Sequence, residues 1–154
     1  MKSEESELLA EVTPKLNLID IRLQTCSLTR PEDYTTEGIP ELGQQSKRAV
    51  EYVVDKITVN DEEKLLLKIL VQFATRLVEK ERSQVEEKDL VVIAEIQADY
   101  LVIYEICGEA TEDQLSVFAR FNAVHNAWPF WRQHVFDQVG RSKLPEISVP
   151  LFSR

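Results

Sequence analysis

A long run in the middle of the chain, Glu63–Val78, carries apolar side chains at every second position. One alternating set consists of Leu65, Leu67, Ile69, Val71 and Phe73. A period of two is typical of a β-strand, in which successive side chains point to opposite faces of a sheet. The other set mixes Leu66 and Leu70 with polar residues. The run therefore predicts a strand whose two faces are both partly apolar.

Other segments read as strands or as loops between them. Further strands are predicted at Asn17–Ser27, Lys47–Val59 and Asp89–Ile106. A turn is expected at Asn60-Asp61, and longer loops at Leu28–Gln45 and Glu79–Lys88. Tandem strands joined by turns predict a four-stranded antiparallel sheet.

The helical signals come after the strands. Thr111 followed by Gln114 forms a capping-box pattern at the start of a helix. We expect a first helix over Glu112–His125, a break or kink at Pro129, and a second helix that stops at Gly140. Strands first and helices later predict an α+β fold, with helices packed on one face of the sheet.

Composition limits the class of protein. The 154 residues are 44% hydrophobic and 29% charged, which is typical of a globular domain. The net charge of −9 argues against direct nucleic-acid binding. No apolar run is long enough to insert into a membrane. We expect a flexible acidic N-terminus over residues 1–15 and a single domain over 16–154.

Nothing in the sequence points to catalysis, a metal or a cofactor. His125 and His134 are nine residues apart, which is not a ligand spacing, and an enzyme built on them with Arg132 has no supporting motif. Cys26 and Cys107 lie far apart and are expected to be inert buried thiols. Because Met1–Glu7 does not resemble a signal peptide, a reduced, cytoplasmic protein is the simplest interpretation.

The aromatic segment Ala127–Arg132 makes the second helix apolar on more than one side. Such a helix must be covered by several neighbours or by other chains. Since the strands are also apolar on both faces, we expect either an oligomer, a bound polypeptide, or both.

The same segment resembles the SecB family of export chaperones. That family has a Phe-Pro-Tyr-x-Arg-like helix start, a basic residue near the helix end, and then Phe-Pro-x-Leu-x-Leu. The matching positions are Trp128, Pro129, Phe130 and Arg132, then Arg141, then Leu144, Pro145, Ile147 and Val149. Ala94–Ala98 is similar to the family's Cys-Glu-Val-Gln-Gln strand segment.

The resemblance implies a SecB-like fold, a dimer of dimers, and ATP-independent binding of unfolded polypeptide in apolar grooves. Carried onto this chain, it places the client-binding groove at Tyr34, Ile39, Leu42, Val92, Trp128 and Trp131. It places the oligomer interface at Ala94, Ile96, Ala98, Phe118 and Phe121.

Two client classes fit this resemblance. Export members continue into a last helix and a segment that docks on the export ATPase, whereas this sequence stops after Leu151–Arg154. A branch of SecB-like proteins instead holds the aggregation-prone antitoxin of a toxin–antitoxin system, and we expect this role first. General preprotein export is the alternative, and a structural homo-oligomer without clients is the second alternative.

Overall fold

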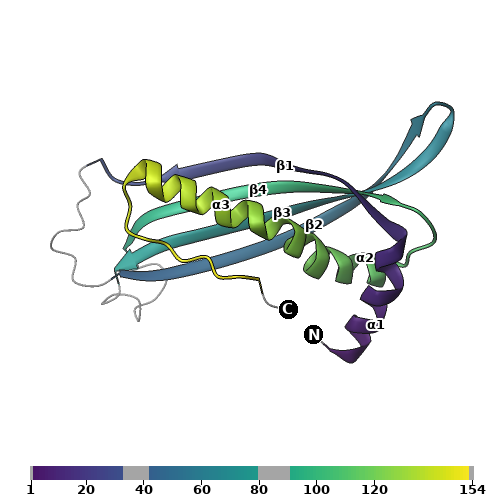
Figure 1. Ribbon diagram of the computed structural model, residues 1–154, viewed down its shortest axis with the longest axis horizontal. Coiled ribbons are helices and arrows are strands. Elements are labelled where there is room, and N and C mark those ends of the chain that lie inside the picture. Colours follow the sequence, from purple (N-terminus) through teal and green to yellow (C-terminus); the bar gives the residue numbers. More distant parts are fainter. Residues whose placement is uncertain (1, 33–41, 80–90, 153–154) are drawn as a thin grey trace.

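The computed structural model describes residues 2–32, 42–79 and 91–152. The chain begins with helix α1 (Ser3–Val12) and a short 3-10 turn (Thr13–Lys15), and continues as four strands and two helices (Figure 1). The strands are β1 (Leu16–Thr29), β2 (Leu42–Val59), β3 (Glu62–Glu79) and β4 (Val92–Ile106). The later helices are α2 (Glu112–Phe118) and α3 (Val124–Ser142). No helix in these three ranges is both long enough and apolar enough to cross a membrane.

The four strands form one antiparallel sheet in the order β1-β4-β3-β2, which confirms the predicted α+β fold. Asn60 and Asp61 have φ angles of 51° and 65° and connect β2 to β3, as a tight hairpin turn requires. Strand β4 ends opposite Leu65, so the tip of the β2–β3 hairpin has no third strand beside it. This tip projects beyond the sheet (Figure 1). The edges of the sheet are β1 and β2.

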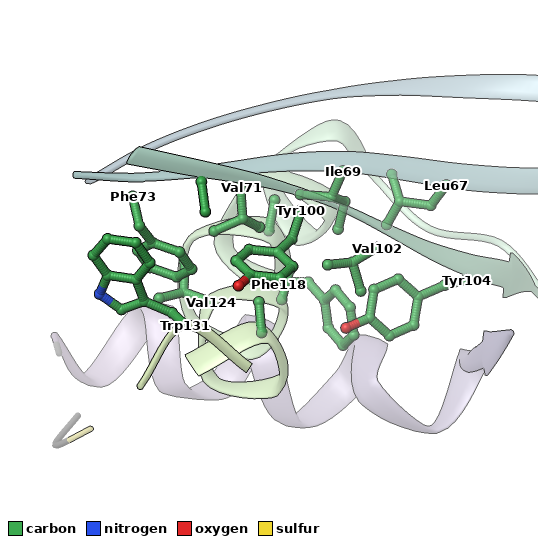
Figure 2. Close-up of a cluster of buried hydrophobic side chains, with 14 of the residues drawn as sticks. Leu67, Ile69, Val71, Phe73, Tyr100, Val102, Tyr104, Phe118, Val124 and Trp131 are labelled. Atoms are coloured by element: carbon green, nitrogen blue, oxygen red, sulfur yellow. The ribbon is translucent and has the colours of Figure 1, made fainter. Parts of the chain in front are cut away.

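Helices cover one face of the sheet, and the hydrophobic core lies between that face and the helices (Figure 2). β3 contributes Leu67, Ile69, Val71 and Phe73, and β4 contributes Ile96, Ala98, Tyr100, Val102 and Tyr104. From the helical side, Phe118 meets the ring of Tyr104 edge-on at 4.8 Å, and Val124 and Trp131 are buried further along. The alternating apolar set from Leu67 to Phe73 thus lies on the covered face of β3.

Helices α2 and α3 form one continuous rod rather than two helices separated at Pro129. A π-helical turn, Ala119–Ala123, connects them, and Pro129 lies inside α3. The expected break at Pro129 is therefore wrong. Proline removes one helical hydrogen bond, to the carbonyl of exposed His125, where water can replace it. Burial of Trp131 beyond the proline offsets that cost.

The end of α3 also differs from expectation. The helix passes through Gly140 and ends at Ser142, and Lys143 adopts the left-handed conformation with φ 56°. The amides of Lys143 and Leu144 both donate to the Val139 carbonyl, which closes the helix. A left-handed backbone is unfavourable for lysine, and the two hydrogen bonds offset this energetic cost.

The N-terminal residues differ from the expected flexible segment. Ser3–Val12 forms α1, which packs beside α2 (Figure 1). Val12 is completely buried and Leu9 is 6% exposed, and both belong to the hydrophobic core. Arg120 pairs with Glu5 at 2.9 Å, which further joins α1 to the π-helical turn. The prediction of a flexible segment followed from its acidic composition, whereas the segment is a helix with one apolar stripe.

Strand β2 begins earlier than predicted, at Leu42, so the expected loop at Leu28–Gln45 ends sooner. Cys26 and Cys107 are both exposed, contrary to the expectation of buried thiols. Cys26 is exposed because β1 is an edge strand.

Candidate functional site

After α3 the chain turns back along the helix towards its start (Figure 1). We call residues 144–152 the return segment. It contains neither helix nor strand. A cavity of about 370 Å³ lies between this segment, α3, β2 and β3. It is lined by Gln44, Ser46, Lys47, Arg48, Phe73, Ala74, Trp128, Trp131, Ser148, Val149 and Pro150. We refer to it as the groove.

The inner wall of the groove is aromatic. Trp131 stacks on Phe73 with ring centroids 5.4 Å apart and an interplanar angle of 18°. Trp128 meets Phe73 edge-on, also at 5.4 Å. Trp131 is only 3% exposed and fixes the wall, whereas Trp128 is half-buried. Since each aromatic side chain can bury about 150–250 Å², this wall can contribute much of the affinity for an apolar segment.

The outer part of the groove is polar, and its side chains bind the main chain of the return segment. Gln44 Nε2 donates to the Ser148 carbonyl at 2.7 Å, and Ser148 N donates to Gln44 Oε1 at 3.1 Å. From just outside the residues that line the groove, Arg132 Nε donates to the Val149 carbonyl at 2.9 Å. Trp128 Nε1 donates to the Pro150 carbonyl at 2.8 Å. These contacts recognise peptide groups rather than side chains.

Phe152 closes the groove at the start of α3. Its ring lies 5.4 Å from that of Trp128 and 5.8 Å from that of His125. The Arg48 guanidinium lies over the same ring at 5.2 Å, which is a cation–π distance. Trp128, His125 and Arg48 thus surround an aromatic side chain beside the groove.

The groove residues predicted from the sequence are only partly brought together. Trp128 and Trp131 line the cavity. Leu42 is half-buried at the start of β2, and Val92 is 41% exposed and pairs with Val78 at the start of β4. Neither is among the residues that line the groove. Tyr34 and Ile39 lie outside the described residues.

The predicted oligomer interface requires correction. Ala94, Ile96, Ala98 and Phe118 are at most 2% exposed, because they lie between the sheet and the helices of their own chain. Side chains already covered in this way offer no surface to a second copy. Phe121 is half-buried, with the Arg120 guanidinium 5.4 Å from its ring centroid.

Burial shifts the pKa of two titratable side chains near the groove. Burial lowers the pKa of His134, which stacks on Trp131 at 6.2 Å. Burial raises the pKa of Tyr100 to about 12, so its hydroxyl stays neutral. In the part of the chain that the structure describes, no three His, Cys, Asp or Glu side chains converge as metal ligands do.

Sequence reasoning missed Gln44, Arg48 and Phe73 as groove residues. Phe73 was correctly placed on the alternating apolar face, but nothing local relates it to residues 128–152. Gln44 falls in the predicted loop Leu28–Gln45, because prolines and glycines recur among polar residues along that stretch. Only the pairing of β2 with β3 brings these positions opposite α3.

Comparison with known proteins finds similar folds only among solved structures. No family model and no curated protein matches the chain by sequence. Among solved structures, it is similar to a Mycobacterium tuberculosis protein, the Rv1957 SecB-like chaperone in complex with a ChAD peptide from the Rv1956 HigA1 antitoxin. The two share 16% identity with a TM-score of 0.68, over 97% of this chain and 99% of the other. The chain has a SecB-like fold.

Proposed function

We propose that this protein is an ATP-independent chaperone that holds unfolded or aggregation-prone polypeptide in the groove. The observation that carries the proposal is the groove's construction, with an aromatic wall beside side chains that bind peptide groups. An unfolded client has no fixed shape, so its affinity must come from apolar burial at about 25 cal/mol per Å² and from main-chain contacts. The SecB-like fold agrees with this role.

We further propose that the client is the antitoxin of a toxin–antitoxin system. The support is that the similar SecB-like chaperone is in complex with an antitoxin peptide. General preprotein binding for export is the competing role, and the same groove would serve it.

The chaperone role is tested by aggregation of a chemically denatured enzyme, followed by light scattering after dilution. The wild-type protein should suppress aggregation at a near-stoichiometric ratio. The double variant Tyr34→Ser/Leu42→Ser tests two positions that the resemblance assigns to client binding, of which Leu42 is the first residue of β2, and it should hold clients less well. Val53→Ser/Val59→Ser is the matched control, because these residues are 58% and 42% exposed on the β2–β3 hairpin. Unimpeded aggregation with the wild-type protein would refute the proposal.

The client class is tested by co-expression with toxin–antitoxin pairs from the same genome. If the antitoxin is the client, the chaperone should raise the soluble antitoxin level and restore growth in the presence of its toxin. Retention of secretory precursors in a translocation-competent state, without any effect on an antitoxin, would favour export instead.

A further inference from the structure

The return segment is bound by the groove as an extended peptide would be. Gln44 both donates to and accepts from the main chain of Ser148, as a neighbouring β-strand does. Arg132 and Trp128 bind the next two carbonyls, those of Val149 and Pro150. None of these four hydrogen bonds depends on the identity of the bound side chain. Any extended polypeptide could receive them.

The segment does not pair with the sheet as a further strand. Among the described residues, no backbone–backbone hydrogen bond joins positions 145–152 to the adjacent edge strand β2. Pro145 and Pro150 have no N–H to donate, which disfavours pairing as a strand. Leu144 and Ile147, each 8% exposed, are its buried anchors, whereas Ser148, Pro150 and Leu151 are exposed.

The segment also lines two separate cavities. Ser148 and Val149 line the groove, and they also line a second cavity of about 880 Å³ on the other side. Phe136 and Val139 of α3 contribute to that second cavity. Removal of the segment would join the two cavities along α3 and expose the carbonyl-binding atoms of Gln44, Arg132 and Trp128.

We propose that the return segment is a displaceable wall of the groove, which holds the main-chain-binding side chains until a client replaces it. The incoming main chain takes the hydrogen bonds of Gln44, Arg132 and Trp128, and an apolar client side chain takes the place of Phe152 against Trp128 and Arg48. This inference rests on the proposed chaperone function and specifies how the same site recognises its client.

Displacement has a quantitative consequence. The apparent dissociation constant equals the intrinsic constant divided by the fraction of molecules in which the groove is open. Loosening the return segment therefore strengthens client binding without adding any contact to the client. A segment that serves as a permanent wall of the groove would have the opposite effect, because loosening it would remove part of the site.

The first test uses Ser148→Pro, which deletes the N–H that donates to Gln44 while leaving Gln44 itself intact. Ser148→Ala is the matched control, since it keeps the N–H and removes only the side-chain hydroxyl. The probe is fluorescein-labelled, reduced and carboxymethylated ribonuclease A, a permanently unfolded chain, and binding is measured by anisotropy. Loss of one hydrogen bond should make Ser148→Pro bind roughly 2- to 10-fold more tightly than the wild type. The Ser148→Ala variant should bind like the wild type.

The second test uses the unmodified protein and measures hydrogen exchange with and without the unlabelled probe. Displacement should accelerate exchange of the amides at 147–152 while the core strands stay protected. Unchanged or slower exchange there with probe bound, or weaker binding by Ser148→Pro, would overturn the inference while leaving the chaperone function standing. Failure of the wild-type protein to bind the probe at all would overturn both.

Discussion

At the scale of single residues, Thr111 carries one of the clearest local determinants of the fold. Its hydroxyl accepts from the Gln114 amide at 3.2 Å, and the Gln114 side chain accepts from the Thr111 amide at 3.0 Å. Thr111→Ala should lower the free energy of unfolding by about 0.5–2 kcal/mol, because the helix amide loses its partner. Urea denaturation measures this, and Thr111→Ser, which keeps the hydroxyl, should retain most of the stability. Equal midpoints for Thr111→Ala and the wild type would contradict the capping role.

His134 makes a separate prediction about pH. Burial against Trp131 depresses its pKa in the folded state below the ordinary value of 6.5, so the unfolded chain binds a proton more readily. The folded state is therefore favoured at neutral pH and loses stability as the pH falls through about 6.5 and below. Asp137 opposes part of this shift.

The measurement compares urea midpoints at pH 8 and pH 5.5. His134→Gln should show a smaller loss between the two values than the wild type. His125→Gln, at an exposed position of the same helix, is the matched control and should keep the wild-type difference. If His134→Gln and the wild type lose the same stability, the burial of His134 does not contribute to the pH dependence.

At the scale of elements, α1 tests whether the N-terminal segment belongs to the core. Val12→Ala removes buried methyl groups from a completely covered side chain and should cost about 1.5–3 kcal/mol. Glu7→Ala, on the exposed side of the same helix, should change the unfolding free energy little. A flexible segment would make the two variants indistinguishable in thermal or urea unfolding.

The helix continues from α2 through α3 although Pro129 disfavours a helix locally. The cost of an internal proline is about 3 kcal/mol. Ala127, Trp131 and Val135 are all at most 3% exposed and lie on both sides of Pro129. Burial of these side chains against β3 and β4 requires an uninterrupted helix, so packing outweighs the local preference.

At the scale of the whole molecule, one chain leaves apolar side chains uncovered. Leu18, Ile19 and Leu23 are 48–55% exposed on edge strand β1, and Phe130 and Phe136 are 50% and 74% exposed on α3. Exposed apolar edges and faces of this kind favour association. We therefore expect a dimer or tetramer by multi-angle light scattering at micromolar concentration.

Two variants separate association from folding. Phe136→Glu should shift the mass towards smaller species while the chain stays folded by circular dichroism. Ile96→Asp should instead unfold the subunit, since Ile96 is completely buried within it. A wild-type monomer would rule out the expected oligomer.

Local signals in the sequence by themselves determined several elements of the fold. The alternation in β3, the Asn60-Asp61 turn and the Thr111 capping box each depend on residues close together in the chain, and the structure contains all three. Trp128 and Trp131, which the family resemblance assigns to client binding, both line the cavity, and their role in client binding stays a prediction. Such features are readable because periodicity, turn conformation and capping act over a few residues.

Only the tertiary structure decided which residues share a site. Gln44, Phe73, Trp128 and Ser148 come from β2, β3, α3 and the return segment, and strand pairing and helix packing bring them together. The same packing docked α1, kept α3 intact through Pro129, and turned Ala94, Ile96 and Ala98 towards the core instead of a partner. Alternation divides a strand's side chains between two faces, but the face that the helices cover depends on burial summed over the whole chain.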